Sequence, residues 1–504
     1  MDNGTFARIV RDACRLDSMV SILKILLDNA TKYKNSYNQC LRPFSFKYSK
    51  GLASLPDELL VHIFKFAALS DETKHAVRLS HVSRKFRALM LEERRFWTKL
   101  HSRAKADEVN AFLSRSGQDT GLYVSIHAVS QLFLDPLAFL NICSHTAPRW
   151  KSLKISEASF LHRDEATANV LLKDMIRRFD LNLARLQDLE IHGSVEPWDD
   201  GDEDVDELRF KFSWPSPNLR VLRCTRFVPL PSPSYSSITS FVTSILGTDR
   251  RRFNIEMRQL CSFLVSCPSI TDLGLKWHVV PDIDDEERNI LPAEPLEITR
   301  ITSFKLLLSN YPIGTATNHL VLAFMRTFKL TNLDHLSFKV DFSPFHLMGR
   351  QVDEVRTTEL LLELAHALIP DPFVHRRLTS LSVDLTYEMP RPLQMMQSRQ
   401  PIKQPRTFTL PLDKIRNVST LKMTTFARTL FTRDATTAPS GLREIRFWKC
   451  KELTSAGLID TVQSLKEYGA WDTLERFVVE DCNALQHDAV LDAISNEKMQ
   501  NLDI

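Results

Sequence analysis

The chain has 504 residues, 43% hydrophobic and 25% charged, which is ordinary for a globular protein but too long for one ordinary domain. Its 13 glycines argue against a glycine-rich phosphate-binding enzyme and against an all-β protein with many tight turns. Residues 1–110 hold 20 Lys and Arg against 12 Asp and Glu, a net charge of +8; the remainder holds 45 against 50, a net charge of −5. Such a basic head suits nucleic acid, an acidic protein partner, or simply a solvated helical face.

The eight cysteines are scattered and form no C-x-x-C pair. The first residues lack the pattern of a secretory signal, because Lys24 interrupts the apolar run between Met19 and Leu27. No window approaches the run of about eighteen apolar residues that a membrane span needs. We therefore expect reduced thiols and a cytoplasmic or nuclear location.

Residues 1–51 are predicted to form an N-terminal helix and a linker. The stretch from Phe6 to Leu27 has the apolar spacing of an amphipathic helix, which is expected to pack on the module that follows. The stretch NSYNQCLRPFSFKYSKG, residues 35–51, is typical of a linker.

A helix is predicted to begin within LPDELLVHIF, the sequence from Leu55 to Phe64. Pro56 suits the first turn of a helix, where its missing N–H is no loss, and Asp57 and Glu58 favour the positive end of the helix dipole. A second helical segment starts near Asp71, and the unit closes with an F-W pair. Two or three short amphipathic helices bury little apolar surface by themselves. A partner or a neighbouring segment is therefore expected to cover part of the apolar surface of this unit.

The motifs L-P-x-E-L-L-x-x-I-F, V-S-R-x-F-R-A-L and F-W follow one another within residues 52–102, and together they resemble an F-box. The resemblance implies a three-helix module that binds the Skp-family adaptor of a cullin–RING ubiquitin ligase. Ser83 departs from the cysteine that many F-boxes have there. The alternative is that the motif residues are only the core of a helical hairpin. The resemblance implies that the residues at the matching motif positions contact the adaptor; these are Leu55, Pro56, Leu59, Ile63, Val82, Ser83, Phe86 and Trp97.

The pattern L-x-x-L-x-L recurs in the second part of the chain, after a segment, residues 103–148, that is predicted to be a helical connector. In this pattern alternate apolar residues point to one side of a short strand. Helical patterns lie between several copies, and the long step between the third and fourth copies is expected to contain an inserted loop, PLPSPSYSS, at 229–237. The ten copies lie at 150–155, 186–191, 219–224, 270–275, 301–306, 333–338, 378–383, 418–423, 442–447 and 474–479.

A short strand alternating with a helix at this period resembles a leucine-rich repeat solenoid of irregular type, similar to fungal-like F-box receptors with such repeats. The last two copies resemble the cysteine-containing subtype, with Cys450 and Cys482 at the turn after the strand. The resemblance implies that these side chains pair with backbone groups of a buried turn; a metal-binding or reactive pair is the alternative. The predicted fold is α/β: an N-terminal three-helix F-box, then an α/β horseshoe over residues 149–504.

Outward strand positions of such a solenoid form a concave binding face. Charges of both signs occupy these positions, and a tryptophan beside a strand end is a good anchor for a partner. The residues predicted to bind a substrate are Lys276, Trp277, Lys339, Lys422, Arg446 and Trp448.

Enzymatic readings find little support in the sequence. There is no G-x-S-x-G, no P-loop, and no H-E-x-x-H. The acidic run DDGDEDVDE at 199–207 has the composition of a calcium loop without its ligand spacing, so a solvated insertion is favoured. We expect no catalytic residues, no cofactor and no metal.

The pattern predicts a substrate-recognition subunit of an SCF-type ubiquitin ligase, whose partners are the Skp-family adaptor, through it a cullin, and an unidentified protein substrate. A membrane is not expected as a partner. Nucleic acid is not expected either, because the basic residues near position 90 come without a helix that could read bases and without aromatic residues on which bases could stack. The alternative is a leucine-rich repeat scaffold whose F-box-like helices only cap the solenoid.

Overall fold

The protein is described here by a computed structural model of the full chain. It divides into two compact units, Met1–Trp97 and Thr98–Ile504, which we call the helical unit and the sheet unit. The structure describes residues 3–48, 55–67, 74–127, 135–156, 175, 177–192, 214–225, 227–247, 250–279, 295–312, 314–342, 354–369, 375–387, 407–433, 441–450, 453–482, 485 and 499–503. The acidic run at 199–207 lies outside these residues.

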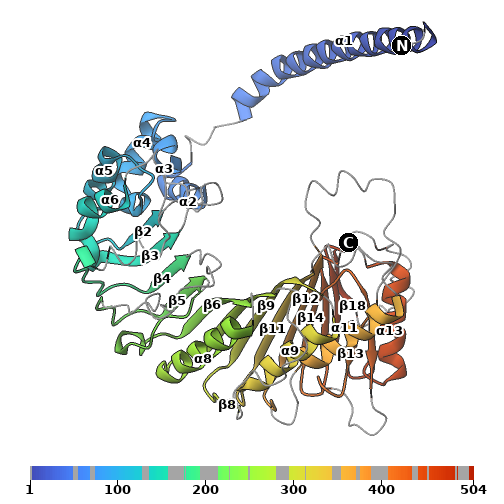
Figure 1. Ribbon diagram of the computed structural model, residues 1–504. Helices are drawn as coiled ribbons and strands as arrows, with labels where there is room; N and C mark the ends of the chain where they lie inside the picture. Colours follow the sequence, from blue (N-terminus) through green and yellow to red (C-terminus); the bar gives the residue numbers. More distant parts are fainter. Residues whose placement is uncertain are drawn as a thin grey trace. The chain divides into compact units, whose positions relative to one another are not determined.

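The helical unit begins with one long helix, α1, Asn3–Tyr48 (Figure 1). This corrects the prediction of a linker over residues 35–51, since the helix continues to Tyr48. No glycine or proline lies between residues 28 and 42 to stop it, and the helix continues through Pro43 to Tyr48. The large apolar side chains from Leu16 to Leu27 are exposed rather than packed, which also differs from the prediction.

Four short elements follow in the helical unit: α2 (Asp57–Ala67), α3 (Lys74–Ser80), α4 (Arg84–Glu92) and the 3₁₀ helix η2 (Arg94–Trp97). Helix α2 carries Asp57 and Glu58 in its first turn, directly after Pro56, as the sequence predicts. Helix α4 has Ser83 as its N-cap, and the Ser83 hydroxyl accepts a hydrogen bond from the backbone N–H of Phe86 at 3.1 Å. Asp71, near which the second helical segment was predicted to start, lies outside the described residues.

Aromatic and aliphatic side chains from all of α2, α4 and η2 form the core of these short helices. Leu60 and Phe64 on α2 are buried, and the Phe64 ring meets that of Phe86 edge-on at 4.6 Å between centroids. Trp97 is fully buried, and its indole N–H donates to the Met90 carbonyl at 2.7 Å. The F-W pair therefore closes the core of this unit.

The sheet unit is built on one parallel sheet whose fourteen strands follow the order of the chain (Figure 1). Each strand pairs in parallel with the strand that precedes and follows it in that order, as in Leu153↔Leu189 and Ile445↔Phe477. The strands are β1 (Lys99–His101), β2 (Leu122–His127), β3 (Trp150–Ser156), β4 (Asp188–His192), β5 (Val221–Thr225), β6 (Ser240–Gly247), β7 (Asp272–Val279), β9 (Ser303–Tyr311), β11 (His335–Phe342), β12 (Ser380–Tyr387), β14 (Thr420–Thr424), β16 (Glu444–Trp448), β17 (Arg476–Glu480) and β18 (Met499–Asp503).

All ten L-x-x-L-x-L copies overlap strands of this sheet, from β3 to β17. Four strands were not predicted: β1, β2, β6 and β18. Strand β2 corrects the wholly helical reading of residues 103–148, which otherwise hold α5 (Ala106–Ser116), α6 (Pro136–Cys143) and the 3₁₀ helix η3 (Ser144–Arg149). Strand β6 corrects the long step after residue 224, since that step contains a strand as well as the predicted loop.

A second layer covers one face of the sheet. Its helices are α8 (Arg250–Ser266), α9 (Thr315–Thr327), α11 (Glu354–Leu368) and α13 (Ser455–Glu467), and the first three overlap predicted helical patterns. Two short strand pairs belong to the connections: β8 (Leu296–Glu297) with β10 (Phe328–Lys329), and β13 (Thr407–Pro411) with β15 (Arg428–Thr432). The 3₁₀ helix η5 (Pro233–Tyr235) lies in the predicted loop. Helix α8 packs on β6, α11 on α9 and β13, and α13 on β15.

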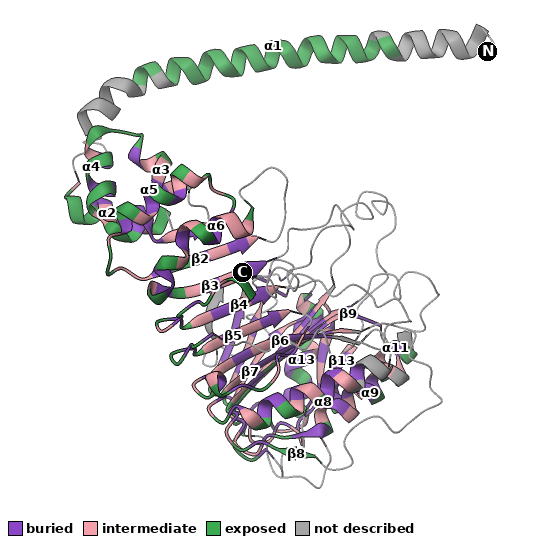
Figure 2. Cartoon of the chain, turned by 60° about the vertical axis from the view of Figure 1, so that its left-hand side comes forward, coloured by how far each residue is buried: buried purple, intermediate pink, exposed green. Residues whose placement is uncertain are grey.

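The core of the sheet unit lies between the sheet and this second layer. Buried and partly exposed residues alternate along the strands, seen in Figure 2 as purple and pink bands. On β16, for example, Ile445 and Phe447 are buried while Glu444, Arg446 and Trp448 are partly exposed. The two-residue period of a strand therefore gives the sheet one buried face and one partly exposed face.

Cys450 and Cys482 occupy matching turns after β16 and β17, and both are fully buried. The residue before each, Lys449 and Asp481, has a positive φ of 55° and 57°. The backbone N–H of Thr425 donates to Cys450 Sγ at 3.3 Å, and the neighbouring Cys482 thiol, followed by burial, raises the pKa of the Cys450 thiol. This is the backbone-pairing role that the resemblance implies, and the raised pKa keeps the Cys450 thiol protonated at neutral pH.

Within the described residues, no helix is both long and apolar enough to cross a bilayer.

Candidate docking surfaces

The exposed face of the sheet holds five of the six residues predicted to bind a substrate. Lys276, Lys339, Lys422, Arg446 and Trp448 are all partly exposed at outward strand positions. Trp277 is the exception and corrects the prediction.

Trp277 follows an outward lysine on β7, so its side chain points to the other face of the strand. It is fully buried, stacked on Phe253 of α8 at 4.9 Å and 5.3 Å from the ring of Phe324 of α9. Its indole N–H is buried without a hydrogen-bond partner in the described part of the chain. Trp277 is therefore a packing residue that joins the sheet to its helices.

Two lysines lie on the ring of Trp448. The Nζ atom of Lys422, on the neighbouring strand, is 3.9 Å from the ring centroid, and that of Lys449 is 4.3 Å away. Cation–π contacts of this kind fix the ring at the exposed face while leaving part of it accessible. The group of Lys422, Trp448 and Lys449 is an aromatic anchor with positive charge beside it.

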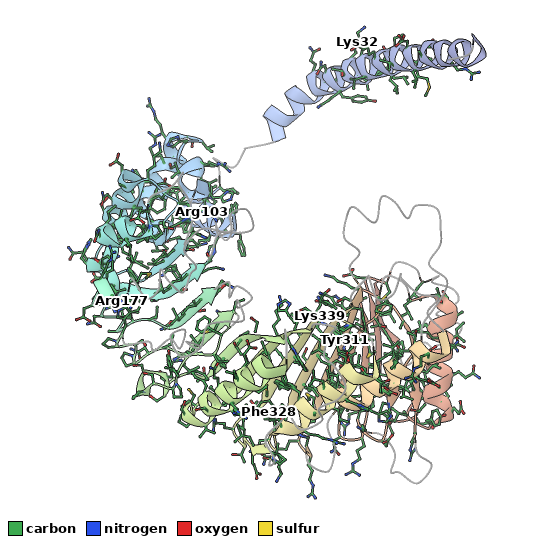
Figure 3. All side chains as sticks on the ribbon, in the orientation of Figure 1. Lys32, Arg103, Arg177, Tyr311, Phe328 and Lys339 are labelled. Atoms are coloured by element: carbon green, nitrogen blue, oxygen red, sulfur yellow. The ribbon has the colours of Figure 1, made fainter. Side chains whose placement is uncertain are left out.

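Asp384 of β12 lies in register with Lys339 of β11, which is labelled in Figure 3. Burial raises the pKa of the Asp384 carboxyl, and the nearby carboxylate of Asp341 adds to the rise. Lys339 and Lys422 oppose it, although Lys339 also pairs with Asp341 at 3.2 Å. This part of the face therefore mixes both signs of charge at close range.

Arg446 is held by carboxylates on its own and the next strand. Its guanidinium lies 3.1 Å from Glu444 and 3.8 Å from Glu480, and Arg476 also pairs with Glu444, at 3.3 Å. Because its charge is already balanced, Arg446 is less available to a partner than Lys422.

A second charged group lies on β3 to β5. The Glu190 carboxylate pairs with Lys154 at 2.8 Å and contacts His192, while Arg223 pairs with Asp188 at 2.8 Å. The hydrogen bond from His192, followed by the Lys154 contact, lowers the pKa of Glu190 to about 2 against the opposing effect of burial. The carboxylate is thus ionised at neutral pH.

Two histidines lie beside this group, His101 on β1 and His127 on β2, with ring centroids 5.4 Å apart. Burial, and next the charge of Arg103, lowers the pKa of each imidazole to about 4. His127 Nδ1 lies 2.8 Å from the Ser156 hydroxyl. Both rings are therefore neutral at pH 7.

Helix α2 of the helical unit has two apolar faces. Leu60 and Phe64 point into the core, whereas Leu59, Ile63 and Phe66 are 51%, 40% and 74% exposed. Their spacing of four and three residues places these three side chains on one face of the helix. The core is already filled by the other face of the helix, and an exposed apolar row of this kind is typical of a protein interaction surface.

The remaining predicted adaptor contacts fall into two groups. Pro56 and Val82 are exposed, the latter by 64%, and Ser83 is exposed as the cap of α4. Leu55 is half-buried, and its carbonyl accepts a hydrogen bond from Lys85, which also pairs with Asp57 at 2.9 Å.

Phe86 and Trp97 are buried by 94% and fully, respectively, which corrects the prediction that they contact an adaptor directly. Their side chains pack inside the helical unit and hold α2 and α4 together. The alternative reading of a helical-hairpin core applies to these two residues.

Residues 52–103 match the family described as F-box-like.

The match covers about a tenth of the chain, begins at the predicted residue and ends one residue later. No curated protein matches the chain by sequence. F-box domains typically bind Skp-family adaptors, and an F-box domain indicates a substrate-recognition role in SCF-type ubiquitin ligases in general. The last matched residues form β1 of the sheet unit.

Phe66 is an exposed apolar residue of the F-box-like domain that was not predicted from the sequence, as is Leu91. Phe66 lies seven residues after Leu59 and three after Ile63, so helical spacing alone could have placed it in the exposed row. The apolar run LLVHIFKF hides this, because residues of both faces are apolar and only the tertiary fold separates them.

Proposed function

We propose that this protein is the substrate-recognition subunit of an SCF-type ubiquitin ligase, acting in the cytoplasm or nucleus. The F-box-like domain binds the Skp-family adaptor, and through it a cullin, by the exposed row Leu59, Ile63 and Phe66 together with the exposed Val82. The sheet unit binds a protein substrate on its partly exposed strand face.

The observation that carries the proposal is the double character of α2 within the family match. One apolar face is used by the core through Leu60 and Phe64, and the other remains exposed to solvent. Burial of this row in an interface would stabilise a complex by about 25 cal/mol for each Å² of apolar surface removed from water. This favours a helical partner with a complementary groove.

We further propose that the sheet unit is an irregular leucine-rich repeat solenoid. Support comes from the ten L-x-x-L-x-L copies on strands of one parallel sheet, and from the matching buried turns at Cys450 and Cys482. Exposed strand faces of solenoids serve as extended binding surfaces. Lys422 with Trp448 is the proposed substrate anchor, joined by Lys276, Lys339 and Arg446.

The chain's own contribution to ubiquitin transfer is proximity. A substrate held on the strand face and an adaptor held on α2 are joined in one particle, which raises the effective concentration of substrate near the separate conjugating enzyme. Accordingly, this protein would carry no catalytic residue and no cofactor.

The experiment is co-expression of the full chain with a Skp-family adaptor, followed by size-exclusion chromatography. The wild-type chain is expected to co-elute with the adaptor one-to-one. A Leu59→Asp/Ile63→Asp variant should lose the adaptor, because two buried charges would oppose binding. The control is Ala88→Asp, which places the same charge at an exposed position of α4 and should retain the adaptor.

Circular dichroism of each variant keeps folding separate from binding. A folded wild-type chain that elutes alone, or a folded double variant that still binds, would contradict the proposal.

A second candidate, a repeat scaffold capped by its helices, is favoured by one observation: β1 at the end of the matched region is the edge strand of the large sheet. The scaffold reading expects that removal of residues 1–97 exposes apolar surface and causes aggregation. A monomeric, folded chain starting at Thr98, which keeps β1, would reject it.

A further inference from the structure

Helix α1 displays an unusual amount of apolar surface. Ten large hydrophobic side chains between residues 16 and 37 are between 49% and 70% exposed, the range running from Val20 to Tyr33. Isolated surface leucines need no explanation, but a contiguous run of this kind marks a surface that another molecule covers.

The exposed residues follow a seven-residue repeat. Counting Leu16 as position a, every a and d position from residue 16 to residue 40 is uncharged, and every one is exposed. These positions are Leu16, Leu23, Ala30 and Tyr37 at a, and Met19, Leu26, Tyr33 and Cys40 at d. Such a repeat sustained over more than three heptads is the pattern of a coiled coil.

The opposite side of the helix is mostly polar, and Ile25, at a c position, is its one large hydrophobic side chain among the described residues. Positions b and f hold Asp17, Ser21, Lys24, Asp28 and Thr31, which mix acidic, basic and neutral side chains. Helices that lie on membrane surfaces instead carry a lysine- and arginine-rich polar face. The composition of this face therefore favours a protein helix over a lipid surface as the occupant.

We propose that α1 pairs with α1 of a second copy of this chain as a parallel coiled coil. In that arrangement each g position faces the e position five residues later in the partner. Ile22 then meets Leu27 and Asn29 meets Lys34, so no like charges oppose each other along the described seam. The seam is complementary to itself, which fits a second copy and needs no other partner.

The pairing extends over a considerable length. The 25 residues from Leu16 to Cys40 span about 37 Å at 1.5 Å per residue, enough for three heptads of knobs in holes. A dimer would carry two F-box-like domains and two strand faces in one particle, so a partner with two binding sites would be held by avidity. The dimerisation itself is independent of the proposed ligase function.

The test uses the full chain and sedimentation velocity over a range of concentrations. The wild-type chain is expected to sediment as a dimer. Leu23→Asp/Leu26→Asp should be monomeric, while the control Ser21→Asp/Asn35→Asp, with the same charges at f positions, should remain dimeric. Leu23→Ala/Leu26→Ala keeps helix propensity high, so its self-association should weaken by at least about 100-fold without loss of the helix.

Orientation is tested with diamide as the oxidant. Cys40 is exposed at a d position, where parallel copies bring the same residue face to face. The wild-type dimer should form a covalent dimer on non-reducing gels, the two thiols giving up two protons and two electrons to diamide. Cys40→Ser should abolish it.

A wild-type chain that is monomeric throughout overturns the proposal, including one that instead binds vesicles of anionic phospholipid. Dimers of both aspartate variants place the contact elsewhere and also overturn it. A dimer that diamide leaves uncrosslinked overturns the parallel arrangement.

Discussion

The helical unit and the sheet unit differ in how many of their large apolar side chains are exposed to solvent. Among the described residues, fifteen of the eighteen large hydrophobic side chains that are strongly exposed lie in residues 1–97, and only Tyr123, Val265 and Ile459 lie in the sheet unit. The sheet unit has about four times the length, so chain length does not explain the difference.

The difference follows from geometry. A strand in a covered sheet places alternate residues on two faces, and one layer of helices is enough to bury the apolar one. A short helix such as α2 has apolar residues on two sides, and its small neighbours cover only one. The helical unit therefore leaves apolar surface exposed, which the proposed partners would cover, whereas the sheet unit covers its own apolar face and exposes polar groups.

The largest effect is expected where the sheet meets its helices. Trp277→Ala should lower the free energy of unfolding by about 3 to 5 kcal/mol, because the fully buried indole stacks on Phe253 and leaves a cavity. Urea unfolding followed by circular dichroism measures the loss.

Trp448→Ala is the matched control on the exposed face. It should cost about 1 kcal/mol or less, mostly from the lost lysine contacts. Equal losses in the free energy of unfolding for the two tryptophan variants would show that the two faces of the sheet are packed alike.

A smaller effect is expected in the helical unit, where the two faces of α2 can be compared directly. Leu60→Ala should destabilise the unit by about 2 to 5 kcal/mol, since Leu60 is fully buried. Leu59→Ala should change stability by about 0.5 kcal/mol at most, since its side chain is half exposed. Hydrogen exchange of α2 amides reports both values, and a large loss at Leu59 would show that this face is already packed.

The last effect concerns the edge of the sheet unit and depends on pH. The imidazoles of His101 and His127 have a pKa of about 4 in the folded chain against 6.5 as the ordinary value. The unfolded state therefore binds more protons between these values, so stability is highest above pH 6.5 and falls as the pH drops towards 4.

The measurement is the melting temperature at pH 7, 6 and 5. The double variant His101→Gln/His127→Gln should show a shallower fall than the wild-type chain. Parallel curves would mean that the two rings are protonated alike in the folded and unfolded states.

Much of the site was readable from sequence because its signals are local. Motif position predicted that Leu59 and Ile63 lie on a contact surface, and both are exposed; alternation predicted that Lys422 and Arg446 point outward. Trp277 was misplaced because it lies two residues beyond its strand motif, where continued alternation puts it on the buried face. Phe86 and Trp97 were misassigned because a motif does not tell a core residue from a contact residue.

Sequence alone determined the repeating strands, the start of α2 and the F-box-like segment, because hydrophobic period, proline and capping residues act over a few neighbouring positions. Tertiary structure decided which apolar face of α2 is buried, that β6 and β2 join the sheet, and that Lys422 and Lys449 meet over Trp448. Those outcomes depend on which distant segments come together, and the sequence of a single strand or helix does not specify which segment packs against it.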